Sequence, residues 1–344
     1  MDVPMWIWLA TVGALGVLFA LDLVIVDRKP HEVGIAEATR WVVFYLACAA
    51  AFGLGIWLFV GSTFAVQYFA GYLTEYSLSV DNLFIFVIIM AAFRVPAIQQ
   101  HRVLLIGIVV ALAMRGLFIA AGAALISHFG WVFYLFGVLL IYLGWRQIRQ
   151  RNQEVEFGEN IVLRALRKVI PVTDEYDGSR LTIKRDGKRW FTPMIVVMIA
   201  IGSVDLVFAL DSIPAIFGLT QEAFLVFSAN AFALMGLRQL YFLIGGLLTR
   251  LVYLPVGLGV ILGFIGVKLV LGALHENSLP FVNGGESLDS VPTVGIELSL
   301  GVIVGVLLVT TVASVRKTRG DQGALSPVRI AGRGRRSGAG SPRR

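Results

Sequence analysis

The sequence predicts an all-α polytopic membrane protein of about nine transmembrane helices with an inverted-topology internal repeat. Composition is the first observation behind this prediction, since 57% of the 344 residues are hydrophobic and only 15% are charged. A soluble domain carries about 25% charged residues. The second is a series of apolar stretches of about 20 residues, the length that crosses a bilayer. The third is a pair of similar acidic motifs inside two of these stretches.

Nine apolar segments succeed one another along the chain. They cover approximately residues 5–26, 38–60, 65–92, 103–126, 130–148, 192–218, 222–248, 255–274 and 294–314. The first segment has no basic residues before it and no obvious small-residue cleavage site, so we interpret it as a span and not as a signal peptide. Only two connections are long, 149–191 and 275–293.

The distribution of Lys and Arg predicts the orientation. The connections after the first, third, fifth and seventh segments are basic, and these fall on one side of the membrane if there are nine spans. The connections on the other side contain no Lys or Arg, and they are 61–64, 127–130, 219–221 and 275–293. By the positive-inside rule the N-terminus is outside and the C-terminus is cytoplasmic. We therefore expect a multi-pass membrane protein in this orientation.

Two regions complete the domain organisation, a transmembrane domain over 1–314 with a cytoplasmic loop at about 149–191, and a basic cytoplasmic tail over 315–344. The tail has nine Lys or Arg against one Asp and is rich in Gly, Ser and Pro, which predicts disorder. Such a tail after a last span is typical of a topology anchor attracted to anionic lipid, so the expected partner is the lipid bilayer and not nucleic acid. The single cysteine, Cys48, excludes a thiolate metal cluster within one chain.

Carboxylates lie deep inside the third and sixth segments. Each segment has an acid, then five residues, then an aspartate followed by a small polar residue: Glu75 with Asp81-Asn82, and Asp205 with Asp211-Ser212. An ionisable group inside the bilayer costs several kcal/mol, roughly, unless it faces a partner, water or an ion. Intramembrane acids therefore indicate a functional site.

The two motifs are separated by a constant offset of 130 residues, and each is followed by a segment with an arginine, Arg115 or Arg238. With nine spans the two acidic segments run in opposite directions, which is the sequence pattern of an inverted-topology repeat with a midplane ion site. Six residues of regular helix leave the two acids of a motif about 120° apart. Local unwinding near Pro214 is one way to bring them together.

The oxygen-rich side chains favour a hard or borderline cation such as Mg²⁺, Ca²⁺ or Mn²⁺. The predicted metal ligands are the carboxylates Glu75, Asp81, Asp205 and Asp211, supported by Asn82, Ser212 and Asn230. The predicted charge-balancing residues are Arg115, Arg238 and Lys268. Protonation of some acids at rest is the other way to limit their repulsion, which suggests proton coupling. A buried salt-bridge network that only joins helices is an open alternative, and Asn230 fits an interhelical hydrogen bond equally well.

Three blocks of sequence, 75–82, 205–214 and 230–238, resemble the signature blocks of TerC-family membrane proteins. The similarity extends over about residues 5–319 and includes 27–31 and 275–280. The resemblance implies a location in the bacterial inner (plasma) membrane, association with tellurium resistance, manganese export and a relation to the LysE transporter superfamily. It also implies Mn²⁺ over Ca²⁺ as the transported ion, and stress-response or secreted metalloproteins as partners. No tightly bound cofactor is expected.

The preferred interpretation is therefore a transporter, not an enzyme, that exports a divalent cation, with Mn²⁺ first and proton exchange as a hypothesis for its coupling. One alternative is a membrane scaffold of a tellurium or metal stress-response complex, with the 149–191 loop and the tail as docking surfaces. Another is an intramembrane aspartyl protease that uses Asp81 with Asp211 or Asp205. The Gly-x-Gly-Asp box of such proteases is absent, since Gly202-Ser203-Val204 precedes Asp205. Tellurite is an oxyanion, and four acids disfavour its direct transport.

Overall fold

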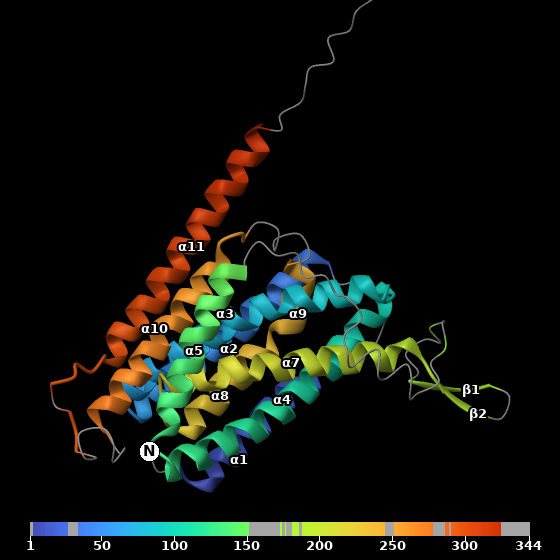
Figure 1. Cartoon of the computed structure of the whole chain (residues 1–344). Helices are drawn as coiled ribbons and strands as arrows, with labels where there is room; N and C mark the ends of the chain where they lie inside the picture. Colours follow the sequence, from blue (N-terminus) through green and yellow to red (C-terminus); the bar gives the residue numbers. More distant parts are fainter. Residues whose placement is uncertain are drawn as a thin grey trace, which may run out of the picture.

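The computed structural model describes residues 3–26, 34–150, 173, 176, 181–185, 188–244, 251–277, 286–288 and 290–324. Most of the 149–191 loop and residues 325–344 of the predicted disordered tail lie outside these residues. The described chain is almost entirely helical (Figure 1). Its helices are α1 (Met5–Val26), α2 (Ile35–Phe59), α3 (Ser62–Ala92), α4 (Ala97–His128), α5 (Val132–Gln150), α7 (Pro193–Phe217), α8 (Ala223–Met235), α9 (Leu237–Ile244), α10 (Leu254–His275) and α11 (Ile296–Ala324).

Seven helical stretches within the described residues are long and apolar enough to cross a membrane. They lie on α2, α3, α4, α7, α8 with α9, α10 and α11. The apolar part of α1 is shorter, Met5–Ala20, and α5 is a 19-residue helix whose last turn contains Arg149. The prediction of an all-α polytopic membrane protein is thus confirmed, while nine crossings and the inverted repeat stay predictions.

Neither acid-bearing helix is broken, which corrects the hypothesis of local unwinding. Pro214 lies within α7, three residues before its end at Phe217. A proline so close to the end of a helix removes only one backbone hydrogen bond, and the helix continues through it. The interruption occurs instead at Gly236, between α8 and α9, in the segment that contains Arg238.

The helix α5 packs closely against α10, and the two run side by side in Figure 1. Glycines make this approach possible, because a methyl group on Gly144 would lie 2.5 Å from the carbonyl oxygen of Gly259. A methyl group on Gly137 would lie 2.9 Å from the carbonyl oxygen of Gly266. Small residues that let backbones approach are typical of helix contacts in membranes.

A short antiparallel hairpin precedes α7, with β1 (Thr182–Arg185) paired to β2 (Lys188–Phe191) so that Thr182 is opposite Phe191. The sequence analysis predicted no structure here. The Asp186-Gly187 dipeptide between the two strands is the signal that predicts such a hairpin. At the other end of the chain, α11 continues to Ala324, ten residues into the segment predicted to be disordered.

Candidate ion-binding site

A buried polar cluster is centred on Arg115 of α4. Its guanidinium forms an ion pair with the carboxylate of Glu75 on α3. The same group donates hydrogen bonds to Asn230 Oδ1 on α8 at 2.8 Å and to Asp205 Oδ1 on α7 at 3.5 Å. Arg115 is only 1% exposed and Glu75 is fully buried. Four helices therefore bring one cation and three oxygen-bearing side chains together within the predicted spans.

Local contacts hold the oxygen atoms of this cluster in place. Ser79, one turn after Glu75 on α3, donates from Oγ to Glu75 Oε1 at 3.1 Å. The amide of Asn230 donates to the carbonyl of Val226 at 3.0 Å, which leaves Oδ1 to accept from Arg115. One turn before Glu75, Gly71 allows close approach, since a methyl group there would lie 3.3 Å from Ile216 Cγ2 on α7. Helical spacing places Ser79 beside Glu75 and Val226 beside Asn230, whereas the approach of Gly71 to Ile216 depends on helix packing.

The charges of the cluster are not balanced. Two carboxylates, those of Glu75 and Asp205, share the single positive charge of Arg115. In the part of the chain that the structure describes, Glu75 Oε2 and Arg115 Nε have no hydrogen-bond partner although both are buried. A buried charge is costly unless it is paired and its hydrogen bonds are satisfied. The excess negative charge and the unsatisfied Glu75 Oε2 favour a further partner such as a proton, water or a cation, while the Arg115 Nε–H can donate only to an acceptor such as water.

The second acid of each motif lies outside the direct contacts of Arg115. Asp81 Oδ2 accepts a hydrogen bond from Gln147 Nε2 on α5 at 2.9 Å. Asp211 forms no ion pair within the described residues, but its carboxylate is close enough to interact electrostatically with both Arg115 and Asp81. Its neighbour Ser212 is buried, with an Oγ that has no hydrogen-bond partner in the described chain. Asp211 therefore interacts electrostatically with the Arg115 cluster and with the Asp81–Gln147 pair.

The sequence analysis missed Gln147 altogether. Its position beside Arg146 near the end of an apolar segment looks like an ordinary interfacial residue, so the sequence contains no signal for its contact with Asp81. The supporting residue Asn82 is buried next to Asp81 on α3.

The three predicted charge-balancing residues occupy different environments. Arg115 contacts the acids directly. Arg238 is equally buried, at 1% exposed, but lies on α9 beyond the break at Gly236. Lys268 on α10 is half-buried, lines a pocket and makes no ion pair among the described residues. The contacts of Arg115 match the predicted arrangement.

No ready-made metal centre is present in the described part of the chain, where no three or more His, Cys, Asp or Glu residues are grouped so that they could hold an ion. The predicted ligands are instead divided between the Arg115 contacts and the Asp81–Gln147 pair. The centre of the oxygen cluster is occupied by a guanidinium group.

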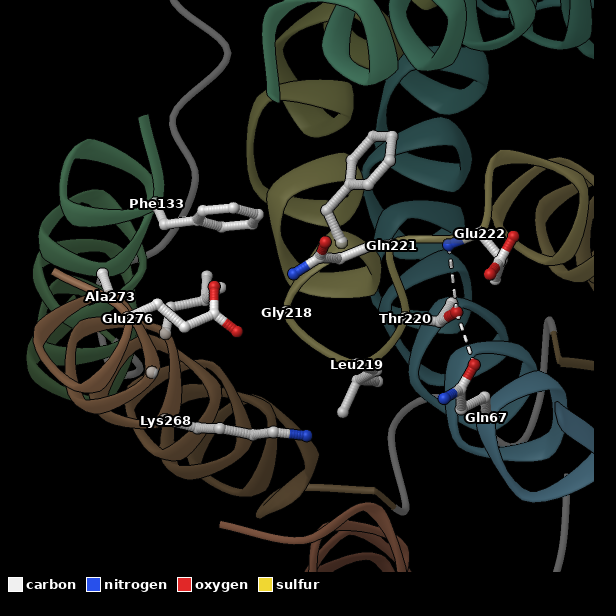
Figure 2. Close-up of a pocket in the computed structure, with 13 residues that line it drawn as sticks. Gln67, Phe133, Gly218, Leu219, Thr220, Gln221, Glu222, Lys268, Ala273 and Glu276 are labelled. Carbon is white, nitrogen blue, oxygen red and sulfur yellow. Dashed lines mark hydrogen bonds between the residues drawn. The ribbon is translucent and has the colours of Figure 1, made fainter. Parts of the chain in front are cut away.

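A pocket of about 330 Å³ lies at the end of α7 (Figure 2). The side chains of Lys268 on α10 and of Glu276, the residue after α10, point into it, as does the ring of Phe133 from α5. Gln67 on α3 closes another side, where its Oε1 accepts a hydrogen bond from Thr220 Oγ1 at 2.7 Å. Among the described residues its lining is Gln67, Phe133, Phe217, Gly218, Leu219, Thr220, Gln221, Glu222, Lys268, Leu269, Gly272, Ala273 and Glu276.

The pocket and the buried cluster share two helices. Gln67 precedes Glu75 by eight residues on α3, which is about 12 Å along a helix. Phe217, at the end of α7, comes six residues after Asp211. The pocket therefore lies about two helical turns along α3 from the acids, beside the 219–221 connection that the charge bias predicts to be outside.

These features define the class of protein as a polytopic α-helical integral membrane protein with charged side chains gathered between its helices. The chain belongs to the TerC family, because the family model described as integral membrane protein TerC family matches residues 60–322. The membership confirms the resemblance of the signature blocks.

Curated relatives extend over most of the chain. The uncharacterized membrane protein Rv2723 of Mycobacterium tuberculosis is 47% identical over 94% of this chain and 82% of its own length. The uncharacterized membrane protein STKORF319 of Myxococcus xanthus is 39% identical over 91% of this chain and 93% of its own length. The putative membrane-bound redox modulator Alx of Escherichia coli K12 is 32% identical over 88% of this chain and 92% of its own length. No solved structure matches the chain.

Proposed function

We propose that this TerC-family protein is a membrane transporter that exports a divalent metal cation, with Mn²⁺ as the first candidate. The observation that supports the proposal is the meeting of Glu75 and Asp205, which are 130 residues apart and occupy equivalent places in the two motifs, at one buried position together with Asn230. Two carboxylates and an amide oxygen from three helices are a suitable ligand set for a cation that prefers oxygen.

The charge of the cluster favours a divalent cargo. When Arg115 does not contact the two carboxylates, a doubly charged ion neutralises the pair, whereas a singly charged ion leaves one negative charge uncompensated in a low dielectric. Oxygen ligands do not separate Mn²⁺ from Ca²⁺, so manganese comes from the family resemblance. Exchange against protons is part of the proposal, because carboxylates that release a cation inside the membrane become less costly when protonated.

The outward path in this proposal leads from the acids to the pocket at the end of α7. Glu276 and Gln67 offer oxygens there, and the pocket lies beside a connection that contains no Lys or Arg. We also propose that the protein lies in the inner membrane with its N-terminus outside. In this proposal the four acids have no catalytic role. Cleavage of a model membrane peptide by the purified protein would contradict this statement.

The test is the metal content of cells under manganese load. Cells that express the wild type should hold less manganese than cells without the protein, and the double variant Asp81→Asn/Asp211→Asn should remove this difference. Glu297→Gln is a matched control, because Glu297 is an exposed acid in the first turn of α11, and it should behave as the wild type. Membrane abundance is measured in parallel by immunoblot. If the folded wild type in the membrane does not change the cellular content of any metal, the proposal of metal export is wrong.

The β1–β2 hairpin supports a second candidate, a scaffold that docks a stress-response partner at the cytoplasmic loop. The hairpin is a paired element outside the apolar segments and offers a surface for a protein. Tyr176, which precedes it in the same connection, donates a hydrogen bond from its hydroxyl to the Phe93 carbonyl at 2.8 Å. Deletion of the loop and tail distinguishes the two candidates. Loss of metal or tellurite resistance with unchanged manganese export favours the scaffold.

Some relatives carry the name putative membrane-bound redox modulator. For this chain, a dithiol reaction within one molecule has no second thiol, because Cys48 is the single cysteine. Export of a redox-active ion such as Mn²⁺ gives an indirect route to a redox effect, and the metal measurement above tests it.

A further inference from the structure

Arg115 occupies the position that a cargo ion would need. Its guanidinium engages Glu75 Oε1, Asp205 Oδ1 and Asn230 Oδ1, which come from three different helices. These are the oxygen atoms that converge at the buried cluster, and Arg115 is enclosed there with 1% of its surface exposed. A metal ion and the guanidinium cannot both hold the same oxygens, because two cations in direct contact repel strongly in a low dielectric.

We propose that Arg115 is a tethered counter-cation, which fills the ion site when no cargo is bound and is displaced when a divalent cation enters. The inference rests on the proposed function and adds a residue that selects the charge of the cargo. Without Arg115, the empty site would hold two uncompensated carboxylates between helices. With it, one of the two negative charges of the empty site is compensated, which lowers the cost of the site inside the membrane.

The exchange explains how the site selects a divalent ion. A guanidinium presents several donors in a rigid fork, and here it makes contacts with three side chains. A singly charged ion such as Na⁺ brings no more charge than the arginine, so it gains no attraction to the carboxylates over the guanidinium and does not displace Arg115. A divalent ion brings twice the charge to the same two carboxylates and does displace it. Specificity for divalent ions thus arises because each ion has to compete with the Arg115 guanidinium for the same oxygens.

The surroundings provide a place for the displaced side chain. Arg115 Nε has no hydrogen-bond partner in the described chain, so no hydrogen bond at Nε opposes a movement of the guanidinium. Asp211 is close enough to interact electrostatically with Arg115, yet it forms no ion pair among the described residues. The Asp211 carboxylate is therefore the acceptor toward which the guanidinium moves when an ion takes its oxygens.

The experiment measures Mn²⁺ binding to the purified full-length protein in lipid nanodiscs, with competition by Na⁺ and K⁺. Arg115→Gln should bind Mn²⁺ about tenfold more tightly than the wild type, because the rival cation is gone. It should also become sensitive to Na⁺ at concentrations that leave the wild type unaffected. Glu75→Gln should bind Mn²⁺ at least about tenfold more weakly, because it removes a ligand.

Chemical rescue provides a readout that a purely structural arginine would not change. Free guanidinium at millimolar concentration should compete with Mn²⁺ in Arg115→Gln and have no effect on the wild type. Arg115→Lys keeps the charge and serves if Arg115→Gln does not fold. It should bind Mn²⁺ more tightly than the wild type, because an ammonium lacks the planar fork.

The outcomes separate this inference from the proposed function. If the wild type binds neither Mn²⁺ nor Ca²⁺ and the Arg115 variants do not either, the proposed function is wrong. If the wild type binds Mn²⁺ and Glu75→Gln does not, while Arg115→Gln and Arg115→Lys bind no more tightly than the wild type, the transporter stands and the exchange is wrong. Arg115 would then be a structural brace between α3, α4, α7 and α8.

Discussion

The buried cluster and the pocket each contain a cation, and the two cations are stabilised in different ways. Arg115 is enclosed between helices and surrounded by oxygen atoms of three side chains. Lys268 is half-buried, faces the pocket and forms no ion pair in the part of the chain that is described. Arg115 therefore depends on protein groups, and Lys268 can rely on water that enters the pocket. The comparison predicts unequal responses to mutation.

Replacement of Arg115 by alanine should have the largest effect on stability. The change leaves Glu75 and Asp205 buried without a counter-charge, and breaking a buried ion pair on one side costs about 3–5 kcal/mol. Thermal unfolding of the protein in detergent, without metal, measures the loss. Arg149→Ala is the control, because Arg149 is exposed and contacts only the Trp145 ring among the interactions described. Equal effects of the two variants would contradict a special role of the buried arginine.

Gly144→Ala tests the helix contact that positions Gln147 of the Asp81–Gln147 pair, on α5, and Lys268 of the pocket, on α10. The added methyl group would meet the carbonyl oxygen of Gly259 at 2.5 Å and force α5 and α10 apart. Overpacking of this kind costs about 1–3 kcal/mol. The same substitution at Gly272 of α10, where nothing lies within 4 Å of an added methyl group, should be nearly neutral. Thermal unfolding of both variants measures the two effects. Similar losses of stability at the two positions would contradict close packing at Gly144.

Gln147→Leu should have a smaller effect on stability, and it tests the contact with Asp81. The substitution removes the donor to Asp81 Oδ2, and a hydrogen bond to a charged group contributes roughly 1.5–3 kcal/mol when buried. Because Gln147 and Asp81 are half-buried, we expect the lower end of this range. The measurement is again thermal unfolding. If Gln147→Leu is as stable as the wild type, the contact contributes little and Asp81 is solvated.

Lys268→Met should have the smallest effect on stability, within about 0.5 kcal/mol, because it leaves no described carboxylate without an ion-pair partner. The thermal unfolding of this variant is compared directly with that of Arg115→Ala. A loss as large as that of Arg115→Ala would place Lys268 within the acid network and remove the distinction between the two regions.

Much of the fold and part of the site could be predicted from the sequence. Apolar length and low charge determine helices that cross a membrane, and each of the nine predicted segments overlaps a described helix, the seventh α8 and α9 together. The acids Glu75, Asp81, Asp205 and Asp211 stand out because a carboxylate within an apolar segment is costly and therefore conspicuous. These are local properties, which a sequence contains in full.

Tertiary structure decided which of these groups meet. Arg115 pairs with Glu75 and with Asp205, 90 residues away, and not every predicted charge-balancing residue joins them, since Lys268 faces the pocket. Gln147 reaches Asp81 from a helix whose sequence carries no sign of this contact. Such contacts depend on how each helix is rotated and how closely neighbouring backbones approach, as at Gly71 and Gly144. The sequence determined that charges lie within the membrane, and helix packing determined that a buried arginine fills the place between them.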